Sequence, residues 1–245
     1  MGLDWNSDGT QLITVIYGNE EAKVYSVATA YDSQSTLTLL GTIDLDDSRI
    51  GITDVRDVFA SNDSNNPYVY FFGRDAGKNI VRYNMHSITD FKSIDLGFFD
   101  YSSYSSYTDI EWKPDGMAFF FSRTGGYINK VDVSYPFNFN PYLDATVTSL
   151  NVGSYLANPR SFTFKGDPSG RTLCVSSNDN GSRMYVFRLT QPWSLTSATV
   201  DPVYIDLSEH GTSAGNRAMA ISNNRASMLF ADRDNDNVQE YKLTF

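Results

Sequence analysis

Five similar units follow one another along this chain, and their regular spacing restricts the fold more than any other feature. Each unit opens with a large or apolar residue and a polar turn rich in Asp, Asn, Gly or Pro, as in Trp5–Gly9. The turns begin at Trp5, Ala60, Trp112, Phe164 and Ile221, which are 55, 52, 52 and 57 residues apart. Repeats of this length that pack on their neighbours favour a closed ring of four-stranded blades.

The segments between the turns are short, apolar and aromatic, and several alternate with the period of two that indicates half-buried strands, as in Val24–Val27. We therefore predict one all-β domain, a five-bladed β-propeller with nineteen strands and no helix. Each blade has four antiparallel strands except the last, which has three. The predicted blades are residues 1–50, 51–104, 105–156, 157–212 and 213–245. A solenoid or a sandwich fits the spacing less well.

The short fifth unit leaves three alternatives open. The last blade has three strands, a partner chain supplies the fourth, or the chain is a fragment of a longer protein.

Composition excludes several classes of protein. The net charge is −10 and the pI is near 4.5, so the surface repels phosphate backbones and we expect no nucleic-acid partner. No apolar run is long enough to span a membrane, and no signal peptide is recognised at the start. Cys174 is the single cysteine, lies in an apolar strand, and is expected to be a buried, inert thiol.

No catalytic motif is evident. The chain has no phosphate-binding glycine loop, no zinc-ligand spacing and no Gly-x-Ser-x-Gly turn, and we expect no cofactor. Weak catalytic candidates are the acidic residues on predicted first strands, namely Asp4, Asp57, Asp109 and Glu111. Two carboxyl groups at a suitable separation are sufficient for a glycoside hydrolase. Because the chain has 29 acidic residues, chance placement is the competing explanation.

Arginines supply the candidate binding site. Aligning the units puts Met1, Arg56, Thr108, Arg160 and Arg217 at equivalent positions near one mouth of the central channel. The same face carries three further arginines in turns, Arg74, Arg123 and Arg233. Guanidinium groups bind carboxylate or phosphate through paired hydrogen bonds, so an acidic sugar or an acidic partner fits such a patch. The alternative is that each arginine pairs with a nearby aspartate or caps loop carbonyl groups between blades.

Two further segments are weaker candidates. Asp232, Asp234 and Asp236 alternate as in a calcium loop, but Asn237 and Leu243 occupy positions where an EF-hand needs Gly and Glu. A polar hairpin turn is the alternative explanation. The Tyr- and Ser-rich stretch 100–107 has the composition of a recognition loop, or else links two blades.

Residues 185–199, which read YVFRLTQPWSLTSAT, resemble a repeat motif of bacteriophage virion propellers, found in tail fibres and other exposed particle proteins. The motif is weaker in residues 133–139 and 83–88, and the first and last units show little of it. The physical alternative is that Pro192–Trp193 is a rigid turn capped by a packed aromatic ring.

The resemblance implies a non-enzymatic structural or adsorption protein located on the virion. Its expected partners are other virion proteins, a host-surface glycan, or further copies of itself. Alternatives are a carbohydrate-binding propeller outside any virion and a five-bladed glycoside hydrolase.

Overall fold

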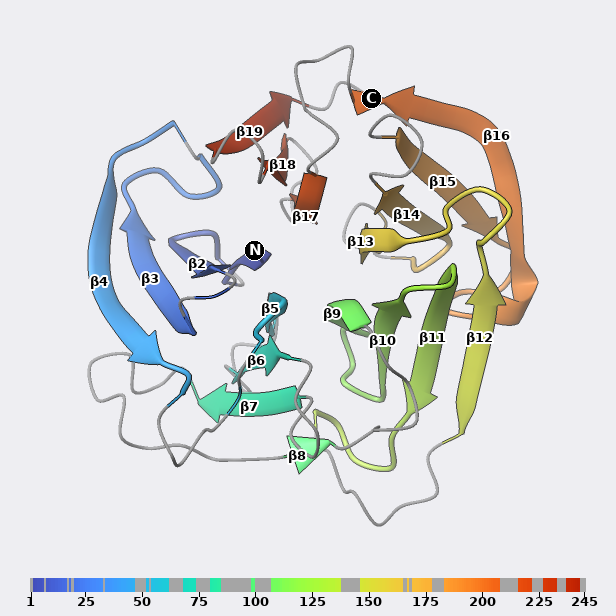
Figure 1. Ribbon diagram of the computed structural model, residues 1–245, viewed down its shortest axis with the longest axis horizontal. Coiled ribbons are helices and arrows are strands. Elements are labelled where there is room, and N and C mark those ends of the chain that lie inside the picture. Colours follow the sequence, from blue (N-terminus) through green and yellow to red (C-terminus); the bar gives the residue numbers. More distant parts are fainter. Residues whose placement is uncertain are drawn as a thin grey trace.

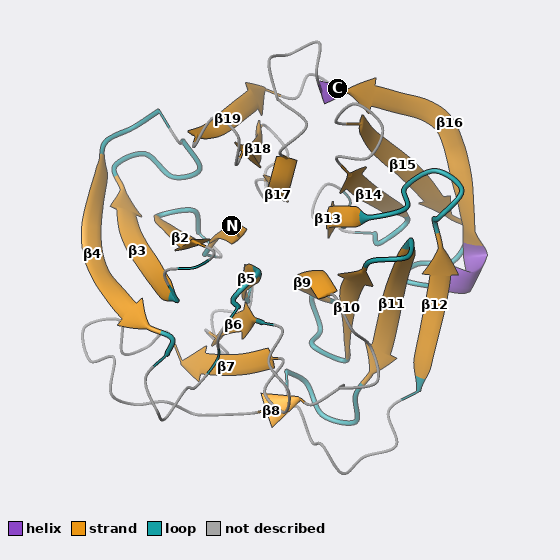
Figure 2. Cartoon of the chain, in the orientation of Figure 1, coloured by secondary structure: helices purple, strands orange, loops and turns teal. Residues whose placement is uncertain are grey.

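The protein is a five-bladed β-propeller (Figures 1 and 2). The computed structural model describes residues 2–46 (without 7, 17, 19 and 33), 52, 54–61, 68–73, 80–84, 98–99, 107–137, 146–177 (without 165, 166 and 168), 183–207, 216–221, 227–232 and 237–242. Nineteen strands and one short 3-10 helix (Leu195–Ser197) lie in these residues, so the predicted fold class is confirmed. No helix in the described part of the chain is both long and apolar enough to cross a membrane.

Each blade is an antiparallel sheet whose strands pair in chain order. Blade 1 contains β1 (Gly2–Trp5), β2 (Gln11–Ile16), β3 (Glu21–Val27) and β4 (Leu37–Asp44). Blade 2 contains β5 (Asp57–Ala60), β6 (Tyr68–Phe72), β7 (Ile80–Asn84) and β8 (Phe98–Phe99). Blade 3 contains β9 (Tyr107–Trp112), β10 (Ala118–Arg123), β11 (Tyr127–Asp132) and β12 (Val147–Asn151). Blade 4 contains β13 (Pro159–Thr163), β14 (Thr172–Ser177), β15 (Arg183–Leu189) and β16 (Ala198–Asp206). Blade 5 contains β17 (Asn216–Ile221), β18 (Ser227–Asp232) and β19 (Asn237–Lys242).

The first strand of every blade lies at the centre of the ring (Figure 1). Consecutive first strands contact one another all the way round, and the last of them, β17, contacts β1. Among the described strands, β1 pairs only with β2 and β19 only with β18. In the part of the chain that the structure describes, no sheet is shared between blades 5 and 1, and side-chain packing joins them.

Five apolar clusters fill the five interfaces between neighbouring blades. The interface of blades 2 and 3 is rich in aromatic rings: the ring centroid of Trp112 lies 5.1 Å from those of Tyr70 and Phe119 and 5.5 Å from that of Phe137. At the closing interface blade 5 contributes smaller side chains, Ala218, Ala220 and Leu229, which pack against four residues of blade 1. These four are Leu3, Trp5, Leu12 and Val27.

The central strands of blades 3, 4 and 5 share an irregularity near their start. The pairing register shifts around Thr108 in β9, Arg160 in β13 and Arg217 in β17. These are the positions that the sequence alignment of the units makes equivalent. A bulge of this kind bends a strand and redirects a side chain.

The segment 185–199 forms a compact turn that fastens an aromatic ring over a glycine. The Trp193 N–H donates to the carbonyl oxygen of Gly170 at 2.8 Å, and both residues have positive φ, 59° and 66°. A Cβ at Gly170 would lie 2.1 Å from the indole, so only glycine fits beneath the ring.

The same arrangement recurs in blades 1 and 3. The Phe137 N–H donates to the Gly116 carbonyl oxygen at 2.9 Å, and the Tyr31 N–H donates to that of Gly9 at 3.0 Å. All four residues have positive φ. The expectation that the first unit largely lacks the motif is therefore wrong, because Tyr31 there occupies the place of the tryptophan.

The serine of the turn confirms this correspondence. The Ser35 Oγ donates to the Asp32 carbonyl oxygen at 2.8 Å, as the Ser197 Oγ does to that of Ser194. In each of these blades the motif thus connects the loop after the third strand to the first turn through a backbone hydrogen bond.

Candidate functional site

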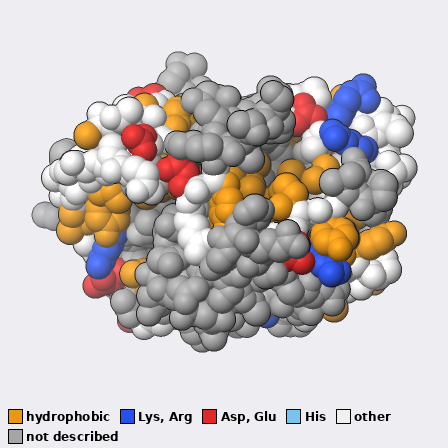
Figure 3. All heavy atoms as spheres, turned by 90° about the horizontal axis from the view of Figure 1, so that it is seen from above, with side chains coloured by type: hydrophobic (Ala, Val, Ile, Leu, Met, Phe, Trp, Pro, Cys, Tyr) orange, Lys and Arg blue, Asp and Glu red, His pale blue; other side chains and the backbone are white. Residues whose placement is uncertain are grey.

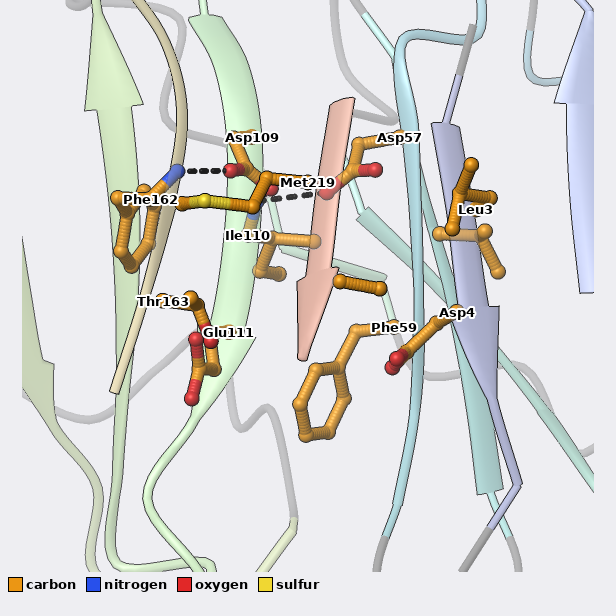
Figure 4. A pocket seen from close by; sticks show the side chains of 12 residues that line it. Leu3, Asp4, Asp57, Phe59, Asp109, Ile110, Glu111, Phe162, Thr163 and Met219 are labelled. Carbon is orange, nitrogen blue, oxygen red and sulfur yellow. Dashed lines mark hydrogen bonds between the residues drawn. The ribbon is translucent and has the colours of Figure 1, made fainter. Parts of the chain in front are cut away.

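The four acidic residues predicted on first strands come together around the central channel (Figure 4). Asp4, Asp57, Asp109 and Glu111 line a small hollow that opens to solvent, together with apolar groups such as Met219. Each of the four is at most 5% exposed. Buried carboxylates are costly unless they are paired or hydrogen-bonded, so their partners decide what they do.

Their partners are mainly backbone N–H groups of the next blade. The Ile110 N–H donates to Asp57 Oδ2 at 3.0 Å, and the Ala60 N–H donates to Asp4 Oδ2 at 2.9 Å. The Phe162 N–H donates to Asp109 Oδ2. Each of these bonds joins one central strand to the next, so the carboxylates link blades 1 to 2, 2 to 3 and 3 to 4.

Two further bonds extend the pattern. The Phe164 N–H lies 3.1 and 3.2 Å from the two carboxylate oxygens of Glu111, which adds a second link between blades 3 and 4. In blade 4, Ser161 occupies the place of Asp57 and Asp109, and its Oγ accepts the Met219 N–H at 2.9 Å. The equivalent residue of blade 5 is Ala218, which has no acceptor for blade 1.

Asp57 and Asp109 lie side by side, and both accept the N–H of Ile110. Burial raises the pKa of Asp57 to about 6, although the hydrogen bond from Asp109 opposes that rise. Burial, and then the charge of Asp57 and the hydrogen bond with it, raise the pKa of Asp109 well above its usual value. A proton shared by the two carboxyl groups avoids two adjacent buried negative charges, so they titrate as a pair.

This geometry allows proton sharing but directs the carboxylates to the protein's own backbone. The space among these side chains holds about one water molecule, far less than an ordinary ligand pocket of roughly 300–1,000 Å³. Asp4 and Asp109 also accept the N–H of the residue that follows each of them, at 2.9 and 2.8 Å. The chemistry that these contacts support is the joining of blades around a shared proton.

Of the six candidate arginines, the side chains of Arg56, Arg123 and Arg160 are described. Arg56 makes an ion pair with Asp54 at 2.6 Å, which is the alternative that the sequence left open. Arg123 stacks its guanidinium 4.3 Å above the ring of Tyr127, and Arg160 is half-buried at the bulge of β13. For Arg217 only the backbone is described, and Arg74 and Arg233 lie outside the described residues.

The other sequence candidates are placed only in part. Asp234, Asp236 and residues 100–106 lie outside the described residues, and for Asp232 only the backbone is described. In the part of the chain that the structure describes, no three His, Cys, Asp or Glu residues are grouped to hold a metal ion. Cys174 is half-buried in β14, and burial raises the pKa of its thiol to about 12, so the thiol is uncharged.

Sequence reasoning missed an aromatic surface on blade 4, formed by Tyr155, Tyr185 and Tyr204. The signal was present only as isolated tyrosines in three separate segments. Their proximity depends on strand register and on the approach of a loop from blade 3, which no local pattern reveals.

Solved structures resemble this fold, whereas no family model and no curated protein matches the sequence. Two similar structures, from Bacteroides fragilis and Bacteroides uniformis, are each named a "putative 6-phosphogluconolactonase". Their identities to this chain are 14% and 16%, and their TM-scores 0.54 and 0.53. The match covers 96% of this chain but only 64% of each of theirs.

A chain of a mitotic checkpoint complex is similar to the same degree. Its TM-score is 0.54 and its identity 14%, with 100% of this chain and 89% of that chain covered. Proteins of such different kinds share the propeller, so the likeness establishes the fold alone.

Proposed function

We propose that this protein is a non-enzymatic structural or adsorption component of a phage virion, which binds other particle proteins through its outer strands. The main observation behind this proposal is that the carboxylates at the central channel are hydrogen-bonded to the protein's own backbone. Asp4, Asp57, Asp109 and Glu111 accept backbone N–H groups of neighbouring blades and so serve the ring itself. A propeller built in this way acts through its surface.

The outer strand of blade 1 is the attachment surface that we assign to a second virion protein. Leu37, Leu39 and Leu40 of β4 are 41%, 52% and 46% exposed. A register shift between Val24 and Tyr25 of β3 lies opposite these leucines. Exposed apolar residues on an edge strand are a surface that another strand or apolar face covers.

The virion assignment draws on the sequence motif. The turn of residues 185–199 has structural counterparts in blades 1 and 3, which supports treating it as a repeated motif of this chain. The lactonase and checkpoint proteins bear on the fold only, because their identity to this chain is 16% or less.

The test is whether the chain is part of a particle. Antibodies against the purified chain should label phage particles from the source material in immunogold microscopy, and the chain should sediment with them. Leu39→Lys should abolish sedimentation with the particle. Met117→Lys, at a 37% exposed position of blade 3, should leave it unchanged. Particles without the chain would overturn the proposal.

The enzymatic alternatives have their own test. Hydrolysis of aryl glycosides and of 6-phosphogluconolactone should not exceed the uncatalysed rate. Turnover that disappears in Asp109→Asn, with the fold retained, would replace the non-enzymatic proposal by a hydrolase acting at the channel.

A further inference from the structure

Three tyrosine rings form a row on the side of blade 4. The ring centroid of Tyr185 lies 5.7 Å from that of Tyr155 and 5.6 Å from that of Tyr204. Tyr155 and Tyr204 are 37% and 43% exposed, and Tyr185 between them is half-buried. The two outer rings of the row are therefore partly exposed to solvent, on either side of a more buried ring.

The row is held by the sheet and by a fixed loop. Tyr185 and Tyr204 are direct cross-strand partners on β15 and β16. Tyr155 belongs to the loop between β12 and β13, where its N–H donates to the Val152 carbonyl oxygen at 2.9 Å. Its ring also meets Phe187 edge-on, with centroids 6.3 Å apart. Such positioning leaves little side-chain freedom to lose when a ligand binds.

A pair of opposite charges lies at one end of the row. The guanidinium of Arg183 stacks 4.4 Å from the ring centroid of Tyr204, and its Nε lies 3.9 Å from Asp206 Oδ2. Arg183 and Asp206 are cross-strand partners two residues along the strands from the tyrosines, on the same face of the sheet. In Figure 3, basic and acidic side chains lie beside hydrophobic ones where the described residues reach the surface.

We infer that this row, with Arg183 and Asp206, binds a neutral hexose unit of a glycan. A pyranose ring has a flat face of C–H groups, which packs on an aromatic face, and hydroxyls around its edge. Arginine offers only donors and aspartate only acceptors, so the pair can bond adjacent hydroxyls. The site combines a flat apolar surface with a few fixed polar groups, which is the composition of small-ligand sites.

Charge favours a neutral ligand over an acidic one. Asp206 balances Arg183, so the site carries little net charge, while the whole chain carries −10. Aromatic rows also stack the bases of single-stranded nucleic acids, but those sites lie in basic grooves. The inference rests on the proposed function only for the biological role of the glycan, since the site itself exists on or off a particle.

The experiment is saturation-transfer NMR on the intact chain. The probes are methyl glycosides of glucose, galactose, mannose and N-acetylglucosamine, with an oligothymidylate as the nucleic-acid probe. At least one sugar should receive saturation on its ring protons. Tyr204→Ala should weaken the binding of that sugar about tenfold, because it removes one stacking face.

The control variant is Tyr135→Ala, which removes a 61% exposed tyrosine away from the row and should leave sugar binding unchanged. Tyr204→Phe should retain most binding, since it keeps the ring, and it guards against a folding defect in the alanine variant. No saturation on any of the four sugars, equal losses in Tyr204→Ala and Tyr135→Ala, or preferential binding of oligothymidylate would each overturn the inference. Attachment to the particle, tested by Leu39→Lys, is read separately, so either proposal can fail alone.

Discussion

Neighbouring blades are held together by different contacts at the interface of blades 2 and 3 and at the interface of blades 5 and 1. Between blades 2 and 3, large aromatic rings are joined by a carboxylate–amide bond from Asp57 to Ile110. Between blades 5 and 1, Ala218 occupies the position of Asp57 and supplies no acceptor. There, apolar contacts between the small blade 5 residues and blade 1 hold the two blades together. Inner interfaces join segments that are already close in sequence, whereas the closing one must draw together the two ends of the ring. The apolar contacts of the closing interface should therefore contribute more to the cooperative unfolding of the whole ring.

Trp5→Ala tests the contribution of the closing cluster and should give the largest loss of stability among these variants. Trp5 is 2% exposed within the closing cluster, and its loss should lower the free energy of unfolding by about 3–5 kcal/mol. Urea unfolding followed by circular dichroism measures the change. Trp5→Phe should cost much less, because the indole N–H has no hydrogen-bond partner among the described residues. A loss of under about 1 kcal/mol in Trp5→Ala would show that closure does not depend on this cluster.

The stability contributed by the buried carboxyl groups of Asp57 and Asp109 should depend on pH. Because the pKa of Asp57 is raised from 3.8 to about 6, the folded state binds more protons than the unfolded state. The associated stability is fully present below pH 3.8 and is lost as pH rises through about 6, by about 3 kcal/mol for a shift of roughly two units.

Urea unfolding between pH 4 and pH 7.5 should therefore show falling stability. The raised pKa of Asp109 adds to this slope, so Asp109→Asn, which cannot ionise, should make the slope shallower while the contribution of Asp57 remains. The lowered pKa values of Asp8, Asp115 and Asp167 act in a separate window, since their contribution is lost only as pH falls below about 4. The same slope in Asp109→Asn as in the parent chain would argue against the shared proton.

Asp109→Ala removes one carboxylate link between blades 3 and 4, the hydrogen bond from the Phe162 N–H, and leaves the link through Glu111. The variant leaves the buried N–H of Phe162 without its carboxylate acceptor, which should cost about 1–3 kcal/mol at neutral pH. Asp109→Asn should cost less, because its amide oxygen still accepts that N–H. Thermal unfolding of the two variants side by side measures the difference, and equal losses would mean that the acceptor is irrelevant.

Ala218→Ser should have the smallest effect. It places in blade 5 the hydroxyl that Ser161 uses in blade 4 to accept the Met219 N–H. We expect a gain in unfolding free energy of up to about 1 kcal/mol, read from the urea midpoint. A clear loss would show that the closing interface tolerates no polar group, which would make the contrast between the two interfaces sharper still.

The periodic sequence predicted the number of blades and strands because each unit repeats the same local chemistry. Trp5, Trp112 and Phe164 begin equivalent turns, and alternation marks the strands between them. The candidate site was predicted less well. Asp57 and Asp109 were singled out as weak catalytic groups, whereas their hydrogen bonds to Ile110 and Phe162 cross between blades. Such partners lie 53 residues apart in the chain, beyond the reach of any local pattern.

The sequence by itself thus determined the repeating blade and its turns, since strand period, turn residues and the glycine beneath Trp193 act over short stretches of chain. The tertiary structure decided which acidic groups share a proton, how the ring closes, and that Tyr155, Tyr185 and Tyr204 form one row. These properties depend on contacts between blades, and burial alone changes a carboxylate from a solvated surface charge into a shared-proton bridge.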